Sequence, residues 1–158
     1  MAERFGFRTI KDAIVTLLGT TAVSDLNSGL ARSVQQIVTV KPTDNNMVIP
    51  TTKYPTVCVW FDNATEEFEG ASKRKKTTAL YQIHFWTYSM GSVDSSLDQA
   101  QLLADNIIYV LNSNIGISSL GSTRGYLKVI GMSFSYSTND SGFVTHGQID
   151  LQIIRIAN

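Results

Sequence analysis

The stretch that decides the fold is residues 77–88, which read TTALYQIHFWTY. Successive side chains of a β-strand point to opposite faces of a sheet. One face of this stretch would carry Ala79, Tyr81, Ile83 and Phe85, and the other Leu80, Gln82, His84 and Trp86. At about 3.3 Å per residue, the stretch spans roughly 40 Å, which is long for a chain of this size. We therefore predict a long strand with one end that projects from the domain.

A helix is predicted directly after this strand, over Ser92–Asn112. Ser92, or Asp94 if the helix starts later, can cap its N-terminus. Apolar residues recur at the spacing of one helical face. They are Leu97, Ala100, Ala104, Ile107, Ile108 and Leu111.

Further strands are predicted on both sides of this pair. Thr56–Phe61 follows Tyr54-Pro55 and is apolar on both faces, which indicates a strand covered on both sides. Tyr126–Tyr136 and Phe143–Ile156 alternate and are joined by a polar turn. The alternation changes near Ile154, which indicates either a bulge or burial of both faces. Val34–Val40 is β-branched and is a possible additional strand.

The N-terminal part predicts a short amphipathic helix over Thr9–Leu18, with a capping box at Thr9 and Asp12 and a stop at Gly19. Residues 20–33 and 41–53 are rich in polar and turn-forming residues and read as loops. The order of elements predicts an α+β fold: an antiparallel β-sheet of four to five strands, two α-helices on one face, and a long projecting β-hairpin. No repeat or linker divides the chain, so we expect one domain over residues 1–158.

The charge balance argues against a general nucleic-acid binder. The 158-residue chain has 13 basic and 13 acidic residues, so its formal net charge is zero. Binding to phosphates needs a basic surface or a concentrated basic patch. Charged residues make up 16%, against about 25% in ordinary soluble domains. A neutral surface with few charges opposes self-association weakly, so we expect a chain that works within an assembly.

Charge is concentrated in residues 62–76, which we call the arm. Its acidic half holds Asp62, Glu66, Glu67 and Glu69, and its basic half holds Lys73, Arg74, Lys75 and Lys76. Three interpretations stay open: a solvated hairpin, a contact with a neighbouring subunit, or direct contact with nucleic acid. The acidic half opposes DNA binding and favours head-to-tail pairing between copies.

Three acidic residues share one face of the predicted 92–112 helix. They are Asp94, Asp98 and Asp105. Asp94 and Asp105 would lie about 16 Å apart along the helix, so one cation cannot bridge the set. A solvated face or a subunit contact is the remaining interpretation.

A search for catalytic, cofactor and metal motifs finds none. The glycines of residues 116–121 lack the strand and helix that flank a phosphate-binding loop. Cys58 sits mid-strand and reads as a buried thiol, with His84 as a possible neighbour; His84 reads as structural, and His146 as exposed. We expect no enzyme activity, no cofactor and no metal site.

No run of residues is long and apolar enough for a membrane helix or a signal peptide. With one cysteine, the chain cannot form an internal disulfide. We therefore expect synthesis in a reducing cytoplasm and no membrane partner.

The ordered pattern resembles the tail terminator (neck, or tail-completion) proteins of tailed bacteriophages. The matching features are the 10–18 helix, the strand YPTVCVW (54–60), the charged hairpin leading into ALYQIHFW (79–86), the helix QLLADNIIYVL (101–111) and the final strand GQIDLQI (147–153). Residues 45–50, NNMVIP, resemble the neck branch of contractile-tailed phages.

The resemblance implies a structural protein of the virion, assembled in the host cytoplasm. It implies a hexameric ring that caps the tail tube, ends elongation and joins the tail to the head–neck connector. A sheath protein is a further possible partner, and DNA would pass through the ring without sequence-specific binding. The implied contacts lie on the arm, Glu66 to Lys76, and on residues 44–53. Alternatives are a head-closure ring, a tube or baseplate protein, or a small ligand-binding α+β domain.

Overall fold

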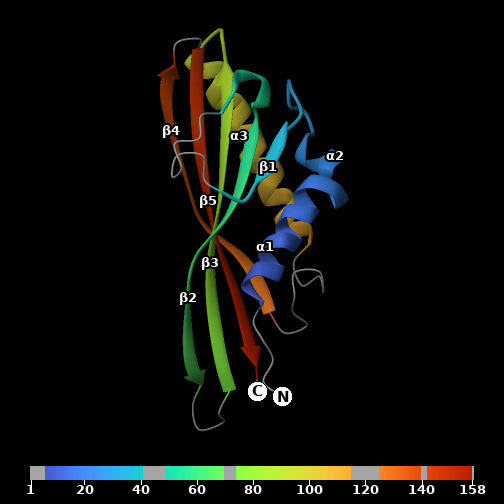
Figure 1. Ribbon diagram of the computed structural model, residues 1–158, viewed down its shortest axis with the longest axis vertical. Helices are drawn as coiled ribbons and strands as arrows, with labels where there is room; N and C mark the ends of the chain where they lie inside the picture. The colour runs from blue at the N-terminus through green and yellow to red at the C-terminus, as the bar shows by residue number, and fades with distance from the viewer. Residues whose placement is uncertain (1–5, 41–48, 70–73, 115–124, 140–141, 158) are drawn as a thin grey trace.

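The computed structural model describes residues 6–40, 49–69, 74–114, 125–139 and 142–157. Its centre is a five-stranded sheet in the order β1-β2-β3-β5-β4. The strands are β1 (Gln36–Val38), β2 (Thr56–Glu69), β3 (Arg74–Ser89), β4 (Gly125–Asn139) and β5 (Gly142–Ala157). They run along the long axis of the molecule, with the helices beside one face (Figure 1). The predicted α+β class is confirmed.

The sheet is mixed rather than purely antiparallel. β2, β3, β5 and β4 pair antiparallel with their neighbours, whereas β1 pairs parallel with β2 over Thr56–Cys58. β1 follows the N-terminal helices in the chain. Because β1 and β2 are parallel neighbours, the connection between them must run back along the sheet. The β-branched run at residues 34–40 thus predicted the strand, and the sequence held no signal for its direction.

The helical layer has four segments. α1 (Phe7–Thr16) runs into a π-helical turn, η1 (Leu17–Thr21), and then into the short α2 (Val23–Leu26). α3 (Val93–Ser113) packs on β3, β4 and β5. A 3₁₀ turn, η2 (Thr51–Lys53), precedes β2.

Two local predictions about the N-terminal helix were wrong. The residue before α1 is Gly6, at φ 78°, with no side-chain cap, so Thr9 and Asp12 form no capping box. Gly19 does not end the helix, because the π-helical turn carries the chain past it. The prediction of a loop over residues 20–33 missed the end of η1 and all of α2.

The core lies between the helices and one face of the sheet. The alternation in residues 77–88 is confirmed, because Ala79, Tyr81, Ile83 and Phe85 are all fully buried on the helix side. Ile10, Ile14, Ile107 and Leu111 cover them from α1 and α3. Ser92 caps α3 as predicted, since its Oγ accepts a hydrogen bond from the Ser95 N–H at 3.1 Å.

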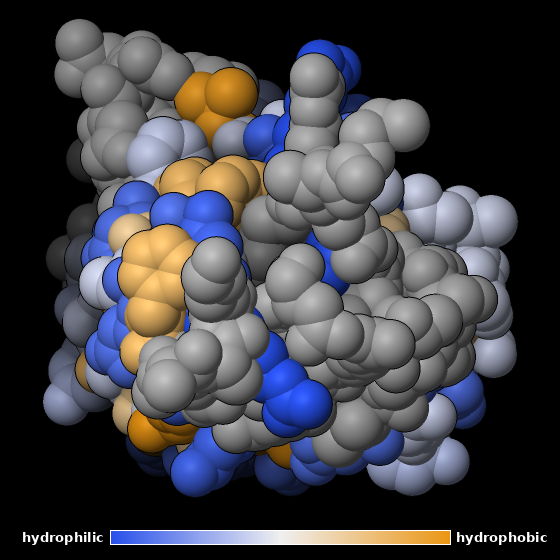
Figure 2. Space-filling model, turned by 90° about the horizontal axis from the view of Figure 1, so that it is seen from below, coloured by the Kyte–Doolittle hydropathy of each residue, from blue (hydrophilic) through white to orange (hydrophobic). Residues whose placement is uncertain are grey.

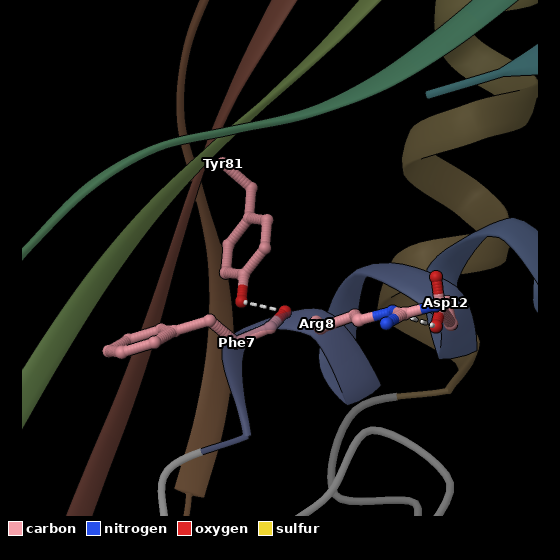
Figure 3. Close-up of polar contacts among 4 residues, drawn as sticks. All are labelled: Phe7, Arg8, Asp12 and Tyr81. Atoms are coloured by element: carbon pink, nitrogen blue, oxygen red, sulfur yellow. Dashed lines mark hydrogen bonds and ion pairs between the residues drawn. The ribbon is translucent and has the colours of Figure 1, made fainter. Parts of the chain in front are cut away.

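Tyr81 fixes α1 to the sheet. Its hydroxyl donates a hydrogen bond to the Phe7 carbonyl oxygen over 2.8 Å, while Arg8 pairs with Asp12 on the exposed side of the helix at 3.7 Å (Figure 3). Burial raises the pKa of the Tyr81 hydroxyl, so it stays protonated and able to donate.

Two β-bulges interrupt the pairing, one between Phe61 and Asn63 in β2 and one between Val129 and Gly131 in β4. Neither falls in β5, where the sequence indicated a bulge or burial on both sides. Burial is the observed case, since Ile153 and Ile154 point to opposite faces and are only 4% and 7% exposed.

Candidate functional site

The arm is a strand pair formed by the end of β2 and the start of β3. β3 has 16 residues and spans about 50 Å. β5 runs beside it as far as the Lys75–Ala157 pair, so the arm has three strands rather than two. Figure 1 shows this part reaching beyond α1 and α3. The described side chains of the β2 part, from Thr65 to Phe68, are exposed.

The charges of the arm pair within the arm itself. Lys75 Nζ lies 2.7 Å from Glu66 Oε1. Glu67 lies opposite Lys76, and Glu69 opposite Arg74, in the strand register. The acidic and basic halves therefore face each other across the hairpin in one copy. Lys73 and Gly70 lie outside the described residues.

The described part of the arm carries one large exposed apolar side chain, Phe68, which was not predicted from the sequence as a contact residue. Phe68 is 76% exposed and lies opposite Lys75. Viewed from this end of the molecule, the described surface is mostly hydrophilic, with separate hydrophobic patches (Figure 2). Single exposed apolar residues are common on protein surfaces, so Phe68 is a candidate contact residue because of its place on the projecting arm.

The acidic face of α3 is exposed as predicted. Asp94, Asp98 and Asp105 all lie on the solvent side, and none of them forms an ion pair among the described residues. Tyr109 continues the same face and is 60% exposed. The i, i+4 spacing from Asp105 could have revealed it in the sequence.

The described part of the sheet's outer edge adds three exposed apolar side chains, of which Ile130 on β4 is 47% exposed. Met132 and Tyr136 on β4 are 47% and 66% exposed. Tyr136 pairs with Thr145, whose Oγ1 lies 2.8 Å from Ser96 Oγ in the first turn of α3. Tyr136 therefore stands beside the start of the acidic face. The arm and this face come from different parts of the molecule and do not form one site within a copy.

The helix-free face of the sheet carries a stacked histidine pair. His84 Nδ1 lies 2.8 Å from His146 Nε2, and His84 Nε2 lies 2.9 Å from Gln82 Oε1. His146 also stacks on Trp86, with ring centroids 4.8 Å apart. The prediction that His146 is exposed was wrong, because the register of β3 and β5 places it beside Trp86.

His84 is structural in this arrangement, as predicted, and it is only 3% exposed. Cys58 is its cross-strand partner and is fully buried, so the thiol has no access to solvent. Burial of this kind leaves a cysteine unreactive.

The described residues contain no cluster of three or more His, Cys, Asp or Glu side chains that could hold a metal ion. A groove of about 320 Å³ lies between η1, α2 and β1 and is lined by residues such as Val15, Leu18, Val23 and Ile37. No titratable side chain lines it.

A second groove, of about 270 Å³, lies on the helix-free face beside both bulges and is lined in part by Asp62, Gln82, Gln148 and Asp150. Gln148 Nε2 donates a hydrogen bond to Asp150 Oδ1 at 2.9 Å.

Within the described ranges, no helix has the length and apolarity to cross a membrane.

Comparisons with solved structures find similar chains. No protein-family model and no curated protein matches this chain. A chain in the solved virion of a native gene transfer agent particle is similar, with a TM-score of 0.48 and 12% sequence identity. The similarity covers 93% of this chain and 94% of that one.

Proposed function

We propose that this chain is a structural protein of a tailed virion and that it forms a ring, with six copies as the expected number. The ring would cap the tail tube, end its elongation and join the tail to the head–neck connector. DNA would pass through its lumen without sequence-specific contacts. The proposal includes no catalysis, cofactor or metal.

The observation that carries the proposal is the distribution of exposed apolar and charged groups. Several of the strongly exposed groups lie on the three-stranded arm, around Phe68, and on the α3 and β4 surface, around Tyr109 and Tyr136, and Met90 is exposed between β3 and α3. Of the two grooves, the 320 Å³ groove holds no titratable group, and the 270 Å³ groove holds Asp62 and Asp150 with no histidine, lysine or arginine in its lining. Surfaces of this kind suit contacts with other protein chains, whereas catalysis needs titratable groups that converge in a cleft. The ordered resemblance to tail terminators narrows the proposal from a virion protein to this role.

The mechanism would be geometric. Identical heterologous contacts between copies close a ring when the rotation between neighbours divides a full turn. One face of the ring would bind the last ring of the tube, and the other would offer no site for a further tube ring. Elongation would stop without any chemical step, and the virion would be assembled in the host cytoplasm.

The test is to disrupt the gene in the strain that produces the particles and to image the products by electron microscopy. A tail terminator predicts tails of excess length or tails without heads. Joined particles with tails of normal length would refute the proposal. Absence of tails would indicate a tube or baseplate protein. Normal tails together with heads that have lost their DNA would indicate a head-closure ring.

A further inference from the structure

We infer that copies of this chain join edge to edge: the free edge of β4 in one copy pairs with the β2 edge, residues 59–69, of the next. The inference rests on the ring proposed above and names the surface that builds it. It commits to a second copy of this chain as the partner, and the argument uses the two edges, their directions and their charges.

The β4 edge is long and poorly protected. Among the described residues, β4 is the last strand on its side of the sheet and has 15 residues. Proteins protect such edges with charges, prolines, bulges or short strands, because an open strand recruits another chain. β4 contains no proline, its only charge is Lys128, and its bulge ends at Gly131. From Met132 to Asn139 it has none of these protections, so a partner strand is expected there.

The β2 edge is open on the opposite side of the sheet, and its acidic residues and bulge protect it against a strand that offers no complementary charge. Among the described residues, β1 covers β2 only over Thr56–Cys58. The remaining stretch, Val59 to Glu69, has no strand neighbour on that side in the described part of the chain. One copy thus offers two different open edges, and a contact between unlike edges is heterologous and can close a ring.

The strand directions fit this contact. β2, β3, β5 and β4 alternate in direction, so β4 runs antiparallel to β2. A second copy rotated about an axis to which the strands are inclined keeps this alternation, and the inclination shifts its β2 along β4, so that residues 59–69 can reach Met132–Asn139. Its β2 would then meet β4 antiparallel, and the alternation would continue across the junction. Antiparallel pairing is the more stable of the two patterns per residue.

The charges favour pairing of unlike edges. The β2 stretch carries acidic residues at 62, 66, 67 and 69 and no base, whereas β4 carries Lys128 and no acid. Two β2 edges would repel each other, and two β4 edges would offer no opposite charge. A β2–β4 junction brings opposite signs together, which selects it over either symmetric contact.

Cysteine cross-linking tests the junction. Asn63 on β2 and Ser133 on β4 are exposed and lie on the helix-free face. We would prepare Asn63→Cys, Ser133→Cys and the double variant, and treat each with a flexible bis-maleimide at concentrations where native mass spectrometry detects the ring. Wild type gives the baseline, because its Cys58 is fully buried.

The double variant should give a ladder of covalent oligomers up to the ring, and each single variant should stay monomeric on a denaturing gel. Asn63→Cys combined with Gln101→Cys, on the exposed side of α3, is the matched control and should give no ladder. Dimers from Ser133→Cys alone would indicate a symmetric β4 contact and overturn the inference.

A ring in the native mass spectrum without a ladder would overturn the edge contact and leave the ring proposal standing. A strict monomer at all concentrations would overturn both.

Discussion

At the scale of single residues, Tyr81 links the sheet to α1 through one hydrogen bond. We expect Tyr81→Phe to lower the free energy of unfolding by about 0.5–1.5 kcal/mol at neutral pH, because the partly buried Phe7 carbonyl loses the hydrogen bond from the Tyr81 hydroxyl. Urea unfolding of the two proteins measures this difference. Tyr109→Phe, at a 60% exposed tyrosine, is the control and should leave stability unchanged.

The same tyrosine predicts a dependence on alkaline pH. Burial raises the pKa of Tyr81 above its ordinary value of 10.0, so the unfolded chain releases this proton at lower pH than the folded one. The stabilisation is therefore complete below pH 10 and declines as the pH rises above it. Desolvation also raises the pKa of Tyr54, and so Tyr81→Phe should reduce the decline rather than abolish it. An equal slope in both proteins would contradict the burial of the hydroxyl.

Gly147 lies so close to the ring of Phe85 that its position leaves no room for a side chain. A Cβ at this position would lie 2.1 Å from Phe85 Cζ, inside the fully buried core. We expect Gly147→Ala to destabilise the fold by about 1–3 kcal/mol, because Phe85 must shift within a packed environment. Thermal unfolding gives the measurement. Gly91→Ala, with its nearest atom at 3.7 Å, should change stability by less than about 0.5 kcal/mol, and equal effects would argue against the close contact.

At the scale of elements, α3 combines a buried face and an acidic face. We expect Ile107→Asp to abolish cooperative unfolding, because Ile107 is fully buried and its replacement would bring an unpaired charge into the core. Circular dichroism during heating measures this. Tyr109→Asp adds the same charge on the exposed side of α3 and should fold normally. A soluble Ile107→Asp variant with a cooperative transition would show that this position is not in the core.

Periodicity predicted the elements that depend on local pattern. The alternation around Tyr81 and the stripe around Ile107 gave β3 and α3 with the correct faces, and Ser92 marked the start of α3. Features that depend on distant pairing were not predictable. The parallel direction of β1, the two bulges and the place of His146 beside Trp86 follow from which strands meet and in which register.

At the scale of the whole molecule, the candidate contact surface was predicted in part. The charged hairpin and the acidic face of α3 were found because charge gathers visibly in the sequence. The pairing of Lys75 with Glu66 within one copy was not, since it depends on the hairpin register. The exposure of Phe68 and Tyr136 was not predicted. Alternation assigns a residue to a face of the sheet and does not show where the helices stop covering that face.

We expect the charges of the arm to stabilise the hairpin within one copy and to attract the next copy. Charge-swap variants distinguish these two roles. Changing Arg74, Lys75 and Lys76 to Glu places like charges across the hairpin, at about 0.2–1 kcal/mol per pair. We expect this variant to keep its core, with a melting temperature lowered by no more than a few degrees, and to lose the ring in native mass spectrometry, because an arm with like charges across its hairpin no longer presents an ordered β2 edge. Loss of the core as well would contradict the separation of the arm from the helix-covered layer.

Changing Glu66, Glu67 and Glu69 to Lys in the same variant restores opposite charges within the arm and leaves bases at these positions on the β2 edge. If the arm worked only within one copy, this swap would restore the ring. We expect it not to, because the edge would now repel Lys128 of the neighbouring copy. Adding Lys128→Glu should then restore the ring, whereas Lys128→Glu alone should weaken it. If the ring recovered without Lys128→Glu, the charges of the arm would not take part in the junction between copies.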